Sequence, residues 1–153
     1  IQSNAQITLK AAMEILSKSE LESAAAMVLI THAALVEIYA KRGDDAEATK
    51  HCLEYAYKRP KEFERNIVPL YKIPAKFPDA ARRKSGQSSV TLEYDIDKNG
   101  YTTNIVVRDA TIRKIENAAI NALKEFRYAP NIRDGKPVAI EGLEMRFSFG
   151  HMK

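Results

Sequence analysis

The sequence predicts an α+β protein: an N-terminal helical hairpin, a linker, and a small αββαβ domain with a three-stranded antiparallel sheet and one packed helix. Two observations carry this prediction. Apolar residues recur at helical spacing through residues 5–58, which contain no proline, and they alternate at strand spacing in residues 90–96 and 143–149. Four of the six prolines then fall within residues 60–78, where they favour extended backbone. We therefore place the helical segment at residues 1–59, the linker at 60–73 and the sheet domain at 74–153.

The first half of the sheet domain has the pattern of a β-hairpin. Alternate residues of its first strand are apolar: Val90, Leu92, Tyr94 and Ile96. Such alternation places one apolar face against a core. Asn99-Gly100 follows, and this pair supplies the positive φ that a tight turn needs. Residues 101–109 then return as a second strand.

One helix and a last strand complete this domain. Apolar residues recur every three or four positions over residues 111–126, which predicts an amphipathic helix, and we expect Pro130 to end it. The last strand alternates apolar with polar residues: Leu143, Glu144, Met145, Arg146, Phe147, Ser148 and Phe149. A short additional helix is expected from Asp79 to Lys84.

Three helices are expected before the linker, at about residues 11–16, 20–42 and 45–58. Gly43-Asp44 separates the last two, as a helix C-cap turn does. The residues from Leu35 to Pro60 resemble one tetratricopeptide repeat, carried by Leu35, Tyr39, Gly43-Asp44, Ala48 and Pro60. Because a single repeat cannot bury its own hydrophobic face, the resemblance implies the end of a longer array.

Charge and hydropathy constrain the partners only weakly. Residues 1–59 carry a net charge of −1 and residues 60–153 carry +5, so the modest basic excess lies in the C-terminal part. The most apolar stretch, residues 24–40, contains His32 and Glu37, and we expect a buried helix there rather than a membrane span. The chain starts at Ile1, so we expect a mature or excised piece whose targeting or membrane segment lies elsewhere.

The C-terminal half resembles the C-terminal domain of the TonB family over residues 73–149. The matching motifs, in the family's order, are Phe77-Pro78, Ala81, Gly86, the Val90–Ile96 strand, Asn99-Gly100, Asn104-Ile105, Ala118-Ala119, Phe126-Arg127-Tyr128-Ala129-Pro130 and Gly135-Lys136-Pro137-Val138. No single motif is specific, and it is their combination and order that carry the resemblance.

The resemblance implies a periplasmic energy-transducing protein, anchored to the inner membrane by a segment absent here. Such proteins work with a proton-driven motor of the ExbB/ExbD type, directly or through another TonB. Their C-terminal domain binds the TonB box, a short peptide of an outer-membrane transporter. No cofactor is implied.

Strand pairing supplies a physical route for that binding. A three-stranded sheet has two edges with unpaired backbone groups, and an extended peptide can add to such an edge. We expect the last strand to be a free edge, and the family resemblance implies that the segment before the aromatic-proline pair also contacts the peptide. The predicted partner-binding residues are Ala75, Lys76, Phe77, Leu143, Glu144, Met145, Arg146, Phe147 and Ser148. An open edge would also permit a strand-swapped homodimer, and Phe147 and Phe149 are candidate core residues under the helix.

Three other functions remain open at this point. The helical segment could make the chain a periplasmic scaffold in which the sheet is structural. Nucleic-acid binding rests on the C-terminal basic excess alone, and we expect none. Hydrolysis would need His51 and Cys52 as a nucleophile pair, but adjacent helix residues point in different directions. Neither metal-ligand spacing nor a glycine-rich phosphate loop occurs in the sequence, so we expect no enzyme.

Overall fold

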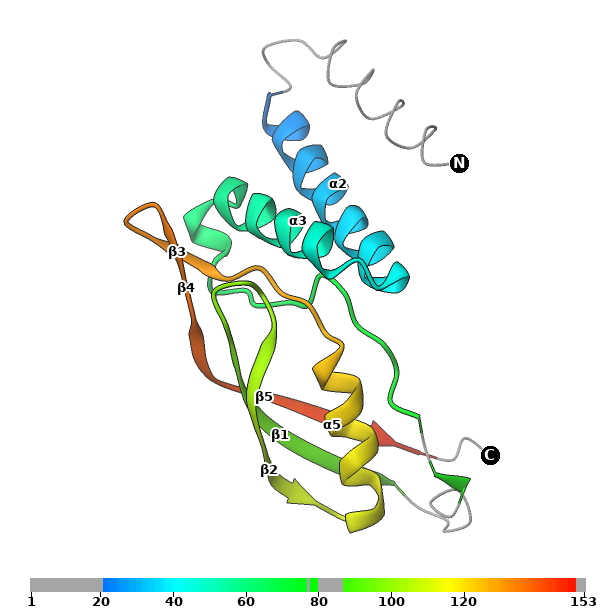
Figure 1. The fold of residues 1–153 in the computed structure, drawn as a ribbon. Helices are drawn as coiled ribbons and strands as arrows, with labels where there is room; N and C mark the ends of the chain where they lie inside the picture. Colours follow the sequence, from blue (N-terminus) through cyan, green and yellow to red (C-terminus); the bar gives the residue numbers. More distant parts are fainter. Residues whose placement is uncertain (1–20, 77, 80–86, 151–153) are drawn as a thin grey trace.

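The protein is described by a computed structural model that covers residues 21–76, 78–79 and 87–150. A helical hairpin lies at one end, formed by α2 (Leu21–Arg42) and α3 (Asp45–Lys58), and a three-stranded sheet with one helix forms the other end (Figure 1). The expected helix at residues 11–16 lies outside the described residues, as does nearly all of the one expected at 79–84.

The turn between α2 and α3 has the geometry that its sequence predicts. Gly43 has a φ of 74°, a left-handed conformation that favours glycine. The Asp44 side chain accepts a 3.2 Å hydrogen bond from the Glu47 backbone N–H and thereby caps α3. Both helix boundaries therefore agree with the sequence prediction to within one residue at each described end. The specific assignment to tetratricopeptide repeats stays a prediction.

Helix α2 is less buried than expected. Its stretch Ser23–Arg42 is long and apolar enough to cross a membrane, and only 11% of the most apolar part is buried. Leu35 and Val36 are buried, whereas Ile30 is 64% exposed and Ile38 is 38% exposed. The expectation of a buried helix is thus wrong for most of α2, because α3 covers only one of its sides.

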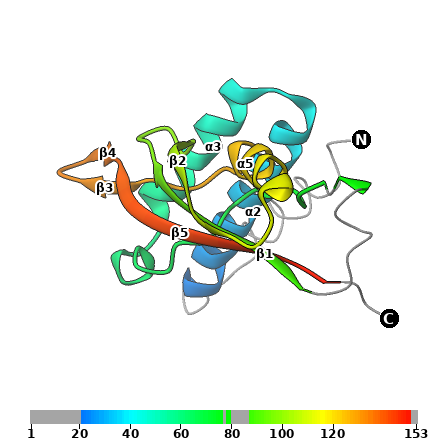
Figure 2. The same cartoon turned by 90° about the horizontal axis from the view of Figure 1, so that it is seen from below.

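The sheet has the strand order β2-β1-β5, with both pairs antiparallel. Its strands are β1 (Ser88–Ile96), β2 (Thr102–Ala110) and β5 (Ile140–Phe149). The four alternating apolar residues of β1 are all buried and face α5 (Glu116–Lys124). Figure 2 shows α5 over one face of the sheet, with β5 along a border of the molecule. The predicted three-stranded sheet with one packed helix is confirmed.

Two local predictions in this domain need correction. The turn after β1 places only Gly100 at positive φ (88°), and Asn99 keeps a negative value. The helix is also shorter than residues 111–126: residues Arg113–Ile115 form a 3-10 turn and α5 ends at Lys124. It ends well before Pro130 because residues 126–130 run as a buried segment beside Tyr71 and Tyr101.

A second, two-stranded sheet was not foreseen. The stretch around Asp134-Gly135 forms a hairpin of β3 (Asn131–Arg133) and β4 (Lys136–Val138). Asp134 and Gly135 both have positive φ, at 52° and 74°, as a two-residue hairpin turn requires. The hairpin projects beside α3 (Figure 1).

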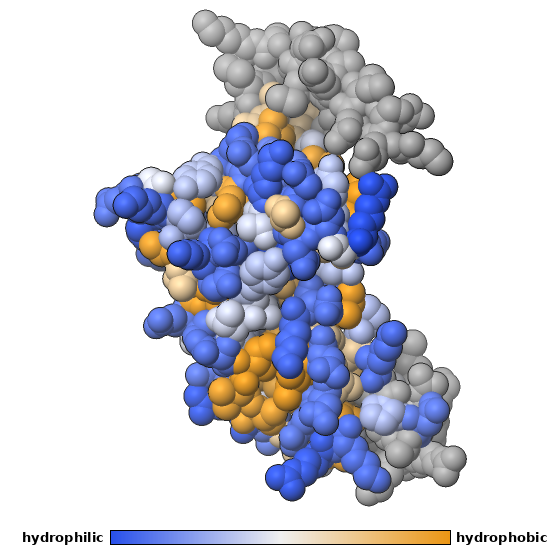
Figure 3. Space-filling model, in the orientation of Figure 1, coloured by the Kyte–Doolittle hydropathy of each residue, from blue (hydrophilic) through white to orange (hydrophobic). Residues whose placement is uncertain are grey.

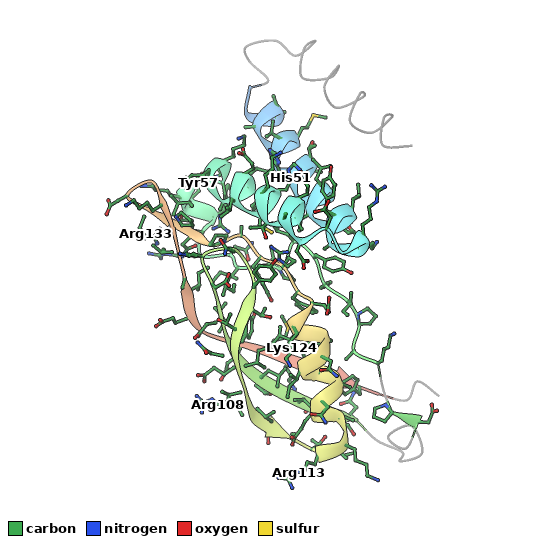
Figure 4. All side chains as sticks on the ribbon, viewed as in Figure 1. His51, Tyr57, Arg108, Arg113, Lys124 and Arg133 are labelled. Carbon is green, nitrogen blue, oxygen red and sulfur yellow. The ribbon has the colours of Figure 1, made fainter. Side chains whose placement is uncertain are left out.

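The helical hairpin packs directly on the sheet domain. Cys52 of α3 is fully buried, and a Cβ added at Gly100 would lie 3.4 Å from its Cβ. Polar contacts surround this packing: Tyr57 donates to the Gly135 carbonyl at 3.2 Å, and Arg59 donates to the Pro130 carbonyl at 3.0 Å. Figure 4 shows Tyr57 and Arg133 at the same end of the molecule. On the face in Figure 3 the surface is mainly hydrophilic, with an apolar patch beside α5.

Candidate functional site along the last strand

A groove of about 550 Å³ lies between β5 and the linker that precedes β1. It is lined by Pro69, Lys72, Ile73, Pro74, Ala75, Phe126, Met145, Phe147, Ser148 and Phe149. Most of these side chains are apolar, which is typical of a surface that receives apolar groups from a ligand. The linker supplies one wall and β5 supplies the other.

The position of α5 explains why this groove is open. The helix packs mainly on β2 and β1, so the apolar side chains of β5 on the same face are only half-buried. Phe126, at the end of the helical region, reaches across to Phe147 with ring centroids 6.0 Å apart. Phe147 and Phe149 are therefore groove-lining residues at the margin of the core, and not fully buried residues under the helix.

The outer edge of β5 pairs with no other strand among the described residues. The direction in which the N–H and C=O groups of β5 point follows from the hydrogen bonds of its neighbour, β1. The Ser89 carbonyl accepts a 3.0 Å hydrogen bond from the Thr111 N–H, so the backbone groups of Ser89 face β2. Ser148 lies opposite Ser89, and the backbone groups of Ser148 must then face away from β1. By alternation, Glu144 and Arg146 also present their N–H and C=O groups outward.

The two faces of β5 differ in chemistry. Met145, Phe147 and Phe149 face the groove, whereas the side chains of Glu144 and Arg146 are exposed on the opposite face; Ser148 is exposed and lies at the margin of the groove. On that face, Arg108 donates to Glu93 at 2.6 Å, and this hydrogen bond holds the pKa of the Glu93 carboxyl below its usual value. Arg146 donates to the Ser89 hydroxyl at 3.2 Å. A strand added to β5 would thus meet an apolar surface on one side and a charged one on the other.

The structure brings together some of the predicted site residues. Ala75, Met145, Phe147 and Ser148 line the groove. Lys76 is exposed beside it without lining it, and Phe77 lies outside the described residues. The remaining three, Leu143, Glu144 and Arg146, do not line the groove, although Glu144 and Arg146 belong to the open backbone edge.

Sequence reasoning found Ala75 but missed the other residues of the linker wall, and it missed Phe126. Tyr71, Ile73 and Ala75 are half-buried, and they alternate with the exposed residues Lys72, Pro74 and Lys76. This period of two was visible in the sequence and is typical of an extended segment. The prolines at positions 69 and 74 concealed it, because they favoured assignment of residues up to 73 to a linker.

Arg127 holds the linker and α3 against this region. Its backbone N–H donates to the Tyr71 carbonyl at 3.0 Å, and its carbonyl accepts from the Leu70 N–H at 2.8 Å. The side chain is 3% exposed, stacks 3.9 Å from the Tyr101 ring centroid and donates to the Thr49 hydroxyl at 2.7 Å. Such stacking of a guanidinium on an aromatic ring is favourable when both are desolvated. Arg127 therefore contacts three separate segments.

The His51–Cys52 pair lacks the geometry of a nucleophile and its base. The Nδ1 atoms of His51 and His32 lie 3.0 Å apart, so the His51 ring is engaged with α2. Cys52 is fully buried, and burial raises the pKa of its thiol to about 11. A thiol in that state is protonated at neutral pH and unreactive. The described residues also contain no cluster of three or more metal-ligating side chains.

These features define a class of protein: a small α+β domain with one packed helix and an open strand edge beside an apolar groove. The chain belongs to the TonB family through this domain, because the family model for the Gram-negative bacterial TonB protein C-terminal region matches residues 74–150, half of the chain.

Individual relatives agree with this assignment. Two proteins named Protein TonB, from strains B100 and ATCC 33913 of Xanthomonas campestris pv. campestris, are 33% identical over 67 residues. That match covers 43% of this chain and 30% of each relative, so the chain spans less than a third of their length.

Two solved structures are also similar to part of the chain. The solution NMR structure of the Pseudomonas aeruginosa TonB C-terminal domain is 24% identical, covers 59% of this chain and 91% of its own, and has a TM-score of 0.49. The TonB2 protein from Vibrio anguillarum is 34% identical, covers 56% and 82% respectively, and has a TM-score of 0.45.

Proposed function

We propose that this chain is the C-terminal part of a periplasmic energy-transducing protein. Its sheet domain binds the TonB box of an outer-membrane transporter by strand addition to β5. It then transmits force from an inner-membrane proton-driven motor of the ExbB/ExbD type, either directly or through another TonB. The single observation that carries this proposal is the unpaired edge of β5, with Glu144, Arg146 and Ser148 facing outward beside an apolar groove.

Strand addition fits the energetics of a reversible coupler. Each main-chain hydrogen bond contributes about 0.5–1.5 kcal/mol net, so a short peptide held by four of them gains about 2–6 kcal/mol. Side chains of the peptide that face Met145 and Phe147 would add apolar contact in the groove. We expect the peptide positions whose side chains face the groove to prefer apolar residues. The positions that alternate with them face the charged side of the sheet and should tolerate charge.

The proposal is tested by NMR titration of the ¹⁵N-labelled chain with a synthetic TonB-box peptide. The backbone amides of Glu144, Arg146 and Ser148 should shift, while amides along β2 stay in place. Two further peptides carry N-methyl groups on alternate residues, one set on odd and the other on even positions. Only the peptide that is methylated on the residues whose N–H groups face β5 should lose binding, because N-methylation removes the hydrogen-bond donors on that edge of the peptide.

Two results would overturn strand addition. One is an unshifted β5 edge at saturating peptide, and the other is equal loss of binding with both N-methylated peptides. Sedimentation across a concentration series shows whether a strand-swapped dimer occupies the edge instead, since an open edge favours such exchange.

A second candidate function is that of a periplasmic scaffold in which the helical segment binds a partner as a tetratricopeptide repeat would. It is favoured by a pocket of about 130 Å³ lined by Leu29, Tyr55, Arg59, Phe63, Asn66 and Val68. Phe63 is 55% exposed and Val68 is 51% exposed beside it, which is typical of an apolar contact surface. If the chain is a scaffold, Phe63→Glu abolishes partner capture. If it binds the TonB box, Phe147→Glu abolishes box binding and Phe63→Glu leaves it intact.

A further inference from the structure

One side chain links the helical hairpin to the groove. Arg127 donates from Nη2 to the Thr49 hydroxyl of α3 at 2.7 Å and to the Asn99 carbonyl at 3.3 Å. Its Nη1 lies 4.0 Å from the Asp45 carboxylate, also on α3. The guanidinium is 3% exposed, so its hydrogen bond to Thr49 is shielded from water, whereas the Asp45 carboxylate is 72% exposed.

The backbone of the same residue fixes the linker. Arg127 and Tyr71 form an antiparallel bridge, and the Arg127 carbonyl accepts from both Leu70 N–H (2.8 Å) and Tyr71 N–H (3.3 Å). The linker residues that line the groove lie on both sides of this bridge in sequence, at Pro69 and from Lys72 to Ala75, and Phe126, next to Arg127, lines the groove as well. The position of Arg127 therefore sets the position of the linker wall and of Phe126, and it leaves the β5 wall unchanged.

We propose that Arg127 is a positioning residue through which docking of α3 sets the shape of the peptide groove. When α3 is docked, Thr49 holds the guanidinium, and the Arg127 backbone in turn holds the linker in register opposite β5. When α3 separates from the sheet domain, the linker loses this support and the groove widens. Peptide affinity is thereby coupled to the state of the helical segment, which is a coupling between two distinct sites. This inference rests on the function proposed above.

A force-transmitting protein has a use for such coupling. The helical segment precedes the linker in the sequence, so a force applied from the N-terminal side acts on α3 before it acts on the linker. Separation of α3 would lower the affinity for the bound peptide and release it.

The test compares variants on α3 that lie outside the groove. Thr49→Val removes the hydroxyl on α3 that accepts from Arg127 and keeps the side-chain shape, whereas Thr49→Ser keeps the hydroxyl. The matched control is Tyr57→Phe, which removes another contact between α3 and the sheet domain, the 3.2 Å bond to the Gly135 carbonyl. That contact involves the β3–β4 turn, which does not line the groove.

Two quantities are measured in the full chain. Hydrogen exchange at the Leu70 and Tyr71 amides reports the linker, with β1 amides as the reference for global stability. Fluorescence anisotropy with a labelled TonB-box peptide reports affinity. We expect Thr49→Val to speed exchange at Leu70 and Tyr71 and to raise the dissociation constant, each about fivefold or more. Thr49→Ser and Tyr57→Phe should resemble the wild type in both measurements.

Failure of this inference is distinguishable from failure of the proposed function. Equal exchange at Leu70 and Tyr71 in Thr49→Val and Tyr57→Phe would overturn the coupling, and so would faster exchange with unchanged peptide affinity. If the wild type binds no TonB-box peptide at all, the proposed function fails. The exchange comparison then still decides whether α3 controls the linker.

Discussion

Gly100 lies where the β1–β2 turn, the segment of Tyr128 and helix α3 meet. Its N–H donates to the Asp97 carbonyl at 3.0 Å, and its carbonyl accepts from the Tyr128 N–H at 2.9 Å. With a φ of 88°, it has a backbone conformation that L side chains rarely adopt. An added Cβ would lie 2.1 Å from the Tyr128 carbonyl oxygen, which no real structure tolerates.

We therefore expect Gly100→Ala to destabilise the protein by about 3 kcal/mol or more, since backbone strain and a backbone clash combine. Denaturant unfolding measures this loss. Gly43→Ala is the matched control: Gly43 has a φ of 74° but nothing within 4 Å of an added Cβ, so it should cost only about 1 kcal/mol. Equal costs for the two variants would contradict the packing of Tyr128 and α3 around Gly100.

At the scale of elements, a pair of histidines lies at the contact between α2 and α3. His32 and His51 face each other across the two helices with Nδ1 atoms 3.0 Å apart, and Tyr39 stacks on His51 with ring centroids 5.6 Å apart (Figure 4 labels His51). One ring must be neutral to accept the hydrogen bond of the other. Burial is the largest cause that lowers the pKa of both imidazoles.

The charges around the pair act in both directions. Lys58 and His51 lower the pKa of His32 further, while Glu54 raises it. Glu47, with its carboxylate 3.9 Å from Nε2 of His51, raises the pKa of His51, and Lys50 lowers it. The net shift is downward for both histidines.

This pair predicts a loss of stability in mild acid. An imidazole whose pKa is lower in the folded protein than in the unfolded one binds more protons when the protein unfolds. The stability that the neutral histidine pair contributes is therefore present above about pH 6.5 and is lost as the pH falls below that value. The free energy of unfolding should fall more between pH 7.5 and 5.5 in the wild type than in His32→Gln, which cannot titrate at this position. The same pH dependence in both proteins would show that the pair contributes nothing.

At the scale of the whole molecule, the helical segment and the sheet domain share an interface. Cys52 packs on Gly100, Arg127 reaches Thr49, and Arg133 of β3 donates to Glu64 of the linker at 2.7 Å. The hydrogen bond from Arg133 is the largest cause that lowers the pKa of the Glu64 carboxyl. An interface of this kind joins segments that the sequence separates by a linker.

We expect the two parts to unfold together. In a denaturant series followed by NMR, the amide peaks of α3 and those of β1 should disappear with a single midpoint, as in a cooperative transition. The physical reason is that unfolding of α3 exposes Cys52 and leaves the buried Arg127 guanidinium without Thr49. An earlier midpoint for α3 would show that the helical segment is an independent unit.

Local patterns determined the elements of this protein. The alternation from Val90 to Ile96 identified β1, and Gly43-Asp44 marked the turn between α2 and α3, because strand and helix periodicity and turn chemistry act between near neighbours. The same reasoning foresaw β5 as an edge strand and three of its groove-lining residues. The family motifs added the proposed function, since fold alone does not determine function.

The tertiary structure decided the rest. Phe126 lines the groove and Arg127 joins α3 to the linker through contacts between residues up to 78 positions apart, and no local pattern encodes such a distance. The end of α5 and the open side of β5 likewise depend on where the helix settles on the sheet. Sequence determined which segments are helix and strand, whereas long-range packing determined which faces remained uncovered, because burial depends on neighbours that the chain brings together only on folding.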